Sequence, residues 1–505
     1  MNNKIEIMDT TLRDGEQTSG VAYTDREKLQ ISKLLLEEVK VDRIEIASAR
    51  VSNGEMNSVE RIVKWADEHK RSAQIEVLAF IDGGKSIEWI EKTGAGNVNL
   101  LCKGSLKHLS LQLRKTPSQH ILDIRREVER ARSAGMKINV YLEDWSNGMF
   151  HSKDYVFELL DALTAMPVER IMLPDTLGIL DPDKTFEYCS AACRRHPLVH
   201  FDFHAHNDYD LAAANSLAAV RAGAKGIHAT VNGLGERAGN TPLASIIAVL
   251  KDHSGAQLNV DEHKLINLSK TVERFSGVRI PTNKPVVGKN IFTQTCGVHA
   301  DGDNKGDLYH NSLSPERFGR TRTYALGKTS GKANIRKNLE ELGIAVESEQ
   351  LIERITERVI ELGDRKEIIT TEDLRYIALD MISNMTEQRV KVCNYSLNVA
   401  NGLRPSATLK LEIDGKQYEK FAPGDGQYDA FMNALRIICA ERKIELPELA
   451  DYIVTIPPGG HTDALVETAI TWKNGGKEFK TRGLDSDQTV SAIKATVKML
   501  NLIYR

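Results

Sequence analysis

The stretch IEIMDTTLRDGEQT, from Ile5 to Thr18, begins as an apolar run fit for a buried strand and ends in closely spaced charged side chains. Asp9, Arg13 and Asp14 all fall within it. A folded core has no structural need for that density of charge beside a strand, because charged groups are seldom buried without a partner. The stretch therefore predicts a strand whose end carries functional groups.

Similar β-rich runs recur through the first half of the chain, each followed by a longer amphipathic or polar stretch. The runs are KIEIMD, DRIEIAS, IEVLAF, NVNLLC, KINVYLED, RIMLPDT, VHFDFHAH and KGIHATVN. Strands that alternate with helical stretches pair in parallel through helical crossovers. Eight such units in about 240 residues predict an α/β fold, a (β/α)₈ TIM barrel. A doubly wound open sheet is the alternative, but no GxGxxG follows the first strand.

The segment TDREKLQISKLLLEEV illustrates the helical pattern between the strands. Thr24, with Glu27 three residues later, predicts a capping box at the helix start. Leu29, Leu34 and Leu35 fall on one broad apolar face. We therefore expect a helix here that covers the barrel.

In such barrels the chemistry gathers where the strands end at their carboxyl side. Many of the predicted strands end in polar residues, so several strands aim functional groups at one mouth. These groups are Arg13 and Asp14 after the first strand, Glu143 after the fifth, Asp175 and Thr176 after the sixth, and His204 and His206 after the seventh.

The motif FDFHAHND predicts a metal site. His204 and His206 are two residues apart, so on a strand both imidazoles project from the same face. Neutral imidazoles bind divalent transition metals, and Asp14 would complete a triad with open coordination positions. Two histidines that only pack or hydrogen-bond inside the barrel are the structural alternative. The carboxylate of Asp14 at a second strand end favours the metal.

After about residue 260 the pattern changes. We expect a catalytic barrel over 1–260, a helical linker region over 261–385 and a C-terminal α+β domain over 386–505. In the last region strands are predicted in VKVCNYSLNVA, SATLKLEI, KQYEKFA, DYIVTIPPGG and ALVETAITW, and helices in QYDAFMNALRIICAERK and TVSAIKATVKMLNLIY. We find no internal repeat.

Composition limits the partners. Lys and Arg number 67 against 70 Asp and Glu, for a formal net charge of −3, so no global field attracts nucleic acid or a membrane surface. The start of the chain has no signal sequence, and no run approaches the roughly 18 apolar residues of a membrane span. We expect a cytoplasmic protein with a small-molecule or protein partner. The six cysteines, of which Cys189 and Cys193 share a predicted helix face, are expected to be reduced thiols.

Four motifs carry a resemblance to a known family. They are TTLRDGEQT, LPDTLG, HAHNDYDLAAANSLAAVRAGAKGIHATVNGLGERAGN and GVHADG. Together they resemble the acetyl-CoA-dependent α-keto-acid condensing enzymes, which comprise isopropylmalate, homocitrate and citramalate synthases within a broader group of barrel metallolyases. The resemblance covers essentially the full chain. One departure is Asp210, where family members often have glycine.

The resemblance implies a binding site for the keto acid. Asp14, His204 and His206 would bind Mg²⁺, Mn²⁺ or Zn²⁺, with Asn240 as a fourth ligand. Arg13 would stabilise the oxyanion formed from the keto carbonyl; an ion pair with Glu45 or Glu16 is its structural alternative. Thr176 would hydrogen-bond the substrate carboxylate, or act only as a strand-end cap.

The co-substrate implied is acetyl-CoA, whose methyl group must lose a proton to a base. Glu143 is our first choice, since it lies at the same mouth; an indirect role in orienting Arg13 or metal-bound water is the alternative. The resemblance adds His299, Asp301 and Tyr309 from the region after the barrel, where a His and Tyr pair would act as acid or base. In the family this region swaps across a homodimer.

The resemblance places Leu78, Leu101 and Tyr141 around the side chain of the keto acid. The last two would fill the space that isopropylmalate synthases leave open, which favours pyruvate, the substrate of citramalate synthases, over 2-oxoisovalerate. Ordinary core residues are the structural alternative for these three.

The C-terminal domain resembles the allosteric regulatory domain of the family. The expected effector is isoleucine, with leucine as the alternative, and the segments of interest are GDGQYDAFMNAL and PPGGHTDALVET. A purely dimerising domain is the alternative reading. Rival functions for the whole chain are a retro-aldol lyase and an inactive metal-binding amino-acid sensor.

Overall fold

The computed structural model describes residues 4–294, 302, 308, 310–346, 348–364, 369, 371–383, 389–455, 466–475 and 477–504. The chain divides into two compact units. One comprises Met1–Thr293 with His310–Thr323, and the other Gln294–Tyr309 with Tyr324–Arg505. The predicted divisions at residues 260 and 385 stay predictions.

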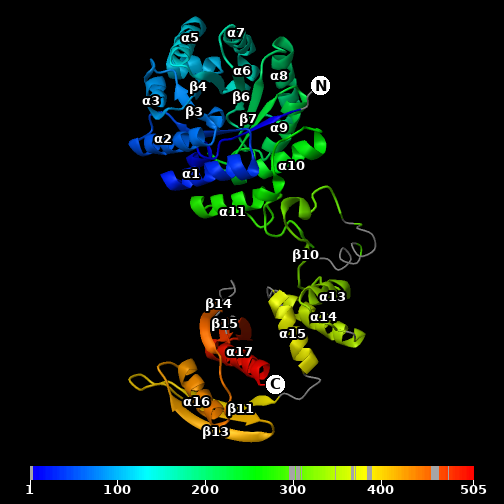
Figure 1. The fold of residues 1–505 in the computed structure, drawn as a ribbon. Helices are drawn as coiled ribbons and strands as arrows, with labels where there is room; N and C mark the ends of the chain where they lie inside the picture. The colour runs from blue at the N-terminus through cyan, green and yellow to red at the C-terminus, as the bar shows by residue number, and fades with distance from the viewer. Residues whose placement is uncertain are drawn as a thin grey trace. The chain divides into compact units, whose positions relative to one another are not determined.

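The first unit contains a closed barrel of eight parallel strands in sequence order, as predicted (Figure 1). The strands are β1 (Glu6–Asp9), β2 (Arg43–Ser48), β3 (Ile75–Phe80), β4 (Asn97–Lys103), β5 (Lys137–Glu143), β6 (Arg170–Asp175), β7 (Phe201–Ala205) and β8 (Gly226–Ala229). Each coincides with one of the eight β-rich runs, so the fold class is confirmed.

Helices surround the strands (Figure 1). They are α1 (Asp25–Lys33), α2 (Asn53–Glu68), α3 (Lys85–Thr93), α4 (Leu106–His108), α5 (Pro117–Ser133), α6 (Trp145–His151), α7 (Lys153–Thr164), α8 (Pro182–Arg195), α9 (Ala212–Arg221), α10 (Leu243–His253) and α11 (Leu265–Ser276). The predicted capping box is present at α1, where the Thr24 hydroxyl accepts the Glu27 N–H and the Glu27 carboxylate accepts the Thr24 N–H. The helix continues over Leu34–Val39 as a π-helical turn.

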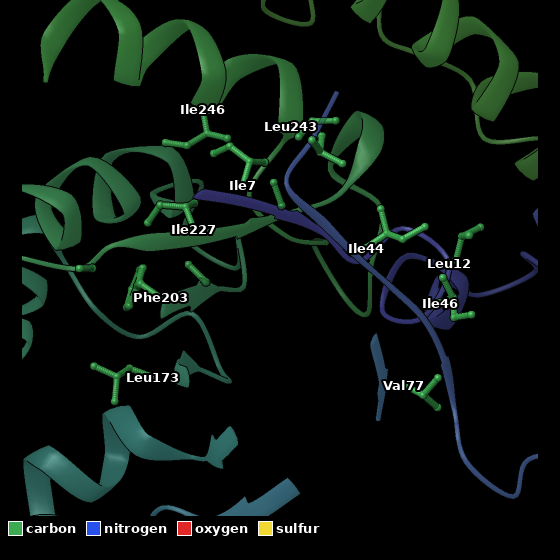
Figure 2. Close-up of a cluster of buried hydrophobic side chains, with 14 of the residues drawn as sticks. Ile7, Leu12, Ile44, Ile46, Val77, Leu173, Phe203, Ile227, Leu243 and Ile246 are labelled. Carbon is green, nitrogen blue, oxygen red and sulfur yellow. The ribbon is translucent and has the colours of Figure 1, made fainter. Parts of the chain in front are cut away.

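The hydrophobic core lies between strands and helices. Figure 2 shows Ile7, Ile44, Val77, Leu173 and Phe203 within this layer, and all five are almost fully buried. Burying a side chain of this size contributes roughly 1.5–3 kcal/mol. Because successive residues of a strand face opposite sides, the alternate residues of these strands face the barrel interior.

The barrel interior is charged near the amino-terminal ends of the strands. Arg43 donates to Glu76 (2.8 Å) and to Asp202 (2.5 Å), and all three are buried. Burial would raise the pKa of Asp202, but the Arg43 charge and hydrogen bonds from His200 and His228 hold it well below its usual value. Gly226 leaves room for this carboxylate, since a Cβ there would lie 2.0 Å from Asp202 Oδ1. At this end the interior strand faces therefore carry charge, whereas the outer faces carry the main hydrophobic core.

Shorter elements follow the barrel. They are β9 (Thr293–Gln294) and β10 (Thr323–Tyr324), which form a two-stranded sheet, and the helices α13 (Lys332–Glu341), α14 (Glu349–Asp364) and α15 (Thr371–Ser383). The three helices share a small core that includes Ile335, Ile355 and Leu374.

The C-terminal region consists of two three-stranded antiparallel sheets, each followed by a helix. The first half is β11 (Val390–Asn398), β12 (Ser406–Ile413), β13 (Lys416–Pro423) and α16 (Gln427–Glu441). The second half is β14 (Glu448–Thr455), β15 (Val466–Asn474), β16 (Lys477–Asp485) and α17 (Gln488–Ile503). Only β16 was not among the predicted strands. Our finding of no internal repeat is wrong, because this βββα arrangement occurs twice.

The repeat is preserved in backbone geometry rather than in side-chain identity. The first strand of each half has a bulge, between Val392 and Asn394 and between Leu449 and Asp451. In each half the chain passes so close to the following helix that a Cβ would collide with helix backbone. At Gly424, one residue after β13, it would lie 2.2 Å from the Ala430 nitrogen, and at Gly483 in β16 it would lie 1.8 Å from the Ser491 carbonyl oxygen. A comparison of side-chain types along the sequence does not detect features of this kind.

Five cysteines are described and all are free, including Cys189 and Cys193 on α8. None of the helices in the described ranges combines the length and apolar character needed to cross a membrane. The cytoplasmic location stays a prediction.

Candidate active site

Arg13 and Asp14 lie in a tight turn that follows β1 at the mouth of the barrel. The backbone N–H groups of both donate to the carbonyl of Thr10, at 3.1 and 2.8 Å. Arg13 is largely buried, and Asp14 is only 1% exposed. The turn thereby points both charged groups into the barrel rather than into solvent.

Glu16 from the same stretch has a different role. The ammonium group of Lys28, a residue of α1 that is only 1% exposed, lies 2.6 Å from a Glu16 oxygen and 2.6 Å from a Glu55 oxygen. It also donates to the carbonyl of Leu12 (3.4 Å). Part of the charge in the opening stretch is therefore structural, since Glu16 and Lys28 anchor the turn that carries Arg13.

Asp14, His204 and His206 meet as predicted. His204 Nε2 lies 3.1 Å and His206 Nε2 4.0 Å from Asp14 Oδ2. One potential ligand atom from each residue lies within 4.8 Å of the others, and all three residues are buried. Asn240 reaches the same place because its backbone pairs with that of His206.

These residues fit a divalent metal ion. The side-chain oxygens Asp14 Oδ1 and Asn240 Oδ1 are buried and have no hydrogen-bond partner in the described part of the chain. Such orphaned acceptors are costly in a folded protein unless an ion or water satisfies them. The donor set of two imidazoles, a carboxylate and an amide oxygen suits a divalent cation with open positions.

The charge states also fit metal binding. Burial lowers the pKa of His206 to about 4 against the opposing effect of the Asp14 charge, so the ring is neutral at neutral pH. Burial alone would raise the pKa of Asp14, but Arg13 and His204 outweigh it and hold that pKa well below its usual value. A neutral imidazole and an ionised carboxylate are the forms that bind metal ions.

Arg13 is held by three partners. Its guanidinium donates to Glu45 (2.5 Å), to Asp14 (3.1 Å) and to the Tyr141 hydroxyl (3.4 Å). Burial opposes the charge, but Glu45 and Asp14 raise the pKa of Arg13 above its ordinary value. The predicted alternative of an ion pair with Glu45 is confirmed, and the pair with Glu16 is wrong because Glu16 binds Lys28. Arg13 is a fixed cation beside the candidate metal ligands Asp14, His204 and His206.

Glu143 ends β5 at the mouth, with a side chain 24% exposed. Its carboxylate accepts a hydrogen bond from Lys103 at the end of β4, and His108 Nδ1 lies 3.9 Å away. Among the described residues it forms no ion pair with Arg13. An indirect role through Arg13 therefore has no support in this geometry.

Thr176 lies in the turn after β6 and is only partly buried. Its hydroxyl accepts the backbone N–H of Asp144 (2.9 Å), which is the capping role given as the alternative. Arg237 donates to the Thr176 carbonyl and pairs through two nitrogens with Asp208. Neighbouring Asp175 accepts two backbone N–H groups within its own loop, so it is a structural residue.

Leu78, Leu101 and Tyr141 come together inside the barrel. With Met8 and Met172 they form an apolar cluster separate from the outer core. Leu101 and Tyr141 are direct register partners on β4 and β5. The Tyr141 hydroxyl, which also contacts Arg13, links this apolar cluster to the charged one.

His228 was missed in the sequence. Its Nδ1 lies 3.0 Å from the Tyr141 hydroxyl and its Nε2 3.1 Å from Asp202, so it fixes the orientation of the tyrosine. Burial lowers the pKa of His228 to about 3. The signal available was a histidine between two outward apolar residues in GIHA, the same period-two pattern that identified His204.

Some predicted residues lie outside the described residues. They are His299, Asp301, Tyr309 and most of the segment PPGGHTDALVET. Asp210 is described and has a left-handed backbone conformation, with φ +59°. Glycine adopts this conformation without strain, so the glycine expected from the family resemblance would fit the same turn.

An eight-stranded barrel with an Asp and His cluster and a fixed arginine at its mouth defines a TIM-barrel enzyme with a candidate metal centre. Three family descriptions match the chain: HMGL-like over 4–272, homocitrate synthase post-HMGL domain-like over 286–367, and LeuA allosteric (dimerisation) domain over 368–504.

Similar proteins cover the full length. A putative (R)-citramalate synthase of Methanopyrus kandleri is 35% identical over 99% of this chain and 96% of its own. A probable 2-isopropylmalate synthase of the same organism is 35% identical over 100% and 99%. The (R)-citramalate synthase of Methanocaldococcus jannaschii is 32% identical over 99% of both chains. The chain belongs to the HMGL-like family, among the acetyl-CoA-dependent condensing enzymes, and is an acyltransferase.

Proposed function

We propose that this enzyme is an (R)-citramalate synthase, which condenses acetyl-CoA with pyruvate and hydrolyses the product to citramalate and CoA. The observation that carries the proposal is the apolar cluster of Leu78, Leu101 and Tyr141 beside Arg13 and the candidate metal site. A leucine and a tyrosine facing each other across neighbouring strands leave room for the methyl group of pyruvate. An isopropyl group would clash, and overpacking of this kind costs roughly 1–3 kcal/mol or more.

The candidate metal site would bind the keto acid. Asp14, His204 and His206, with Asn240, would hold a divalent ion such as Mg²⁺ or Mn²⁺. When bound, such an ion polarises the keto carbonyl as a Lewis acid. Thr176 has a hydroxyl hydrogen to donate to the substrate carboxylate, since its oxygen is the acceptor for Asp144.

The residues divide the condensation between them. Glu143 removes a proton from the acetyl methyl group, and the resulting carbanion forms a carbon–carbon bond with the keto carbon. The keto oxygen becomes an alkoxide that Arg13 stabilises and that then takes up a proton. Water attacks the thioester carbonyl, the carbon–sulfur bond breaks, and CoA leaves as a thiol. His299, Asp301 and Tyr309, from the second subunit of a homodimer, would assist as acid or base.

A 2-isopropylmalate synthase that uses 2-oxoisovalerate is the second candidate. The probable 2-isopropylmalate synthase of Methanopyrus kandleri is as identical to this chain, at 35%, as the putative citramalate synthase. Overall identity therefore does not separate the two substrates. The residues of the apolar cluster favour pyruvate.

The C-terminal domain would regulate the enzyme. The match to the LeuA allosteric (dimerisation) domain supports a homodimer whose activity responds to an amino acid. Isoleucine is the effector expected of a citramalate synthase in isoleucine synthesis, and leucine that of an isopropylmalate synthase. The start of α16, within GDGQYDAFMNAL, is the described segment where we propose the effector acts.

The test is thiol release from acetyl-CoA by the full-length protein with Mg²⁺ or Mn²⁺. Pyruvate, 2-oxobutyrate, 2-oxoisovalerate and 2-oxoglutarate are compared, with and without isoleucine or leucine. A strong preference for pyruvate supports the proposal, and a preference for 2-oxoisovalerate replaces it with the second candidate. Thiol release with none of the four would indicate the inactive amino-acid sensor.

A further inference from the structure

We propose that Lys103 is a positioning residue for catalysis, which holds the Glu143 carboxylate in place at the mouth of the barrel. Lys103 was not identified from the sequence. The inference rests on the role proposed above for Glu143 as the base. It adds a charged residue on β4, the strand that also carries Leu101 of the apolar cluster.

The register of β4 and β5 puts the pair directly above the keto-acid pocket. Leu101 is opposite Tyr141, and Lys103 is opposite Glu143, two residues nearer the carboxyl ends of the strands. Two residues of a strand span about 6.6 Å, and alternate residues share one face. The apolar pair thus forms a floor, and the charged pair lies one layer nearer the mouth, where a second substrate would meet the first.

Lys103 is fixed in place. The residue is only 8% exposed, its backbone N–H donates to His120 Nε2 (3.1 Å), and its carbonyl accepts the Tyr155 hydroxyl (2.8 Å). Its ammonium pairs with Glu143 and with no other carboxylate in the described ranges. A buried ammonium is costly, so a lysine at this place indicates a need for its charge.

The other charged groups around Glu143 do not replace Lys103. His108 lies 3.9 Å from one oxygen, but it carries a charge only when protonated. Asp144 is engaged elsewhere, since its carboxylate accepts from Ser105 (2.6 Å) and Asn147 (2.8 Å) and lies 3.4 Å from His108 Nε2. Lys103 is therefore the permanent positive charge that faces Glu143 within the described part of the chain.

A general base must lie within hydrogen-bond reach of the proton that it removes. Without Lys103 the Glu143 carboxylate loses the ammonium group that holds it, so it should be less well oriented. The loss should appear in kcat, while the binding of the two substrates is little changed.

The experiment measures kcat and the KM values for pyruvate and acetyl-CoA in the thiol-release assay. Lys103→Met removes the charge and keeps most of the volume, Lys103→Arg keeps the charge, and Lys107→Met is the matched control on the exposed surface of α4. We expect Lys103→Met to lower kcat by about 10-fold or more, with both KM values little changed. Lys103→Arg should restore much of kcat, and Lys107→Met should match the unmodified protein.

An unchanged kcat in Lys103→Met, or a Lys103→Arg variant as slow as Lys103→Met, would overturn the proposal. A rise confined to the KM for acetyl-CoA would also overturn it, since Lys103 would then only bind the CoA moiety. If Lys103→Met does not fold, judged by circular dichroism, Lys103→Gln is used with the same expectation. Failure of the unmodified protein to use any keto acid would refute the proposed function, which is a separate result from an unchanged kcat of Lys103→Met in an active enzyme.

Discussion

The barrel and the C-terminal sheets both alternate apolar and polar residues along their strands, but they use the alternation in opposite ways. In the barrel the outward residues are apolar and face the helices, and many inward residues are polar, as Phe203 and His204 show. In the C-terminal sheets the apolar residues, such as Leu409 and Ile470, face the helices and build one core shared by both halves. The polar residues of β12 lie at alternate, less buried positions.

The side of the strands on which the polar residues lie indicates where function lies in each region. Inside the barrel, polar groups removed from water need partners, and the partners they find are one another and, by our proposal, a metal and substrates. In the C-terminal region, the polar strand faces need only water or another protein. Substitutions on the inner barrel face should therefore alter chemistry, and those in either apolar layer should alter stability.

The largest expected effect on activity comes from a substitution in the candidate metal site. Asp14→Asn removes the only carboxylate of the triad, and a bound metal supplies several kcal/mol of transition-state stabilisation. We expect kcat/KM to fall by about 10⁴-fold and Mn²⁺ affinity, measured by isothermal titration calorimetry, to fall by more than the roughly 10- to 100-fold typical of losing an outer partner. Asp154→Asn on the exposed surface of α7 is the control. Unchanged Mn²⁺ affinity in Asp14→Asn would place the metal elsewhere.

The outer layer should behave differently from its inner neighbours. Phe203 is fully buried between strand and helices, so Phe203→Ala should lower the free energy of unfolding by about 3–5 kcal/mol. Phe431→Ala, in the C-terminal core, should cost a similar amount. Calorimetric unfolding measures both. At temperatures where the variants are folded, the KM for pyruvate of Phe203→Ala should be unchanged. A large rise in that KM would contradict the view that the outward strand face affects stability alone.

Tyr141 should set the choice of keto acid. Tyr141→Val opens space in the apolar cluster, so kcat/KM for 2-oxoisovalerate relative to pyruvate should rise by about 10- to 200-fold. Tyr141→Phe keeps the ring and removes only the hydroxyl contacts to His228 and Arg13, so it should reduce the rate without changing the preference. A ratio that does not move in Tyr141→Val would show that the substrate side chain lies elsewhere.

The smallest effect concerns stability and pH. Burial raises the pKa of Asp9 to about 7, although its Oδ1 accepts the N–H of Thr11. A carboxyl with a raised folded-state pKa stabilises the fold most at low pH, and that contribution is lost as pH rises from about 4 to about 7. We expect Asp9→Asn to be less sensitive to pH over this range than the unmodified protein, as measured by urea unfolding. Parallel pH dependence in the two proteins would contradict this assignment.

Much of the fold was predictable because it depends on local patterns. The eight barrel strands, the capping box at Thr24 and the inward pairing of His204 with His206 all follow from spacing along a single element. The doubled βββα arrangement was not predictable, since it is preserved in bulges and in close backbone approaches such as that at Gly483.

The site was predictable in part for the same reason. Residues placed by a strand end, such as Asp14, were found, and the contact of Arg13 with Glu45 was foreseen as an alternative. Lys103 and His228 were missed, because their partners are on other strands far away in sequence. The register of β4 and β5 brings Lys103 to Glu143, and closure of the barrel brings His228 on β8 to Tyr141 on β5 across the interior. A single sequence specifies neither.

The most direct test is a crystal structure of the protein with Mn²⁺ and pyruvate. Our account predicts anomalous density for one ion at about 2.2 Å from ligand atoms of Asp14, His204 and His206. It also predicts the methyl group of pyruvate against Leu101 and Tyr141, with the keto oxygen toward Arg13. An ion bound away from these three residues, or a methyl group pointing out of the apolar cluster, would contradict it.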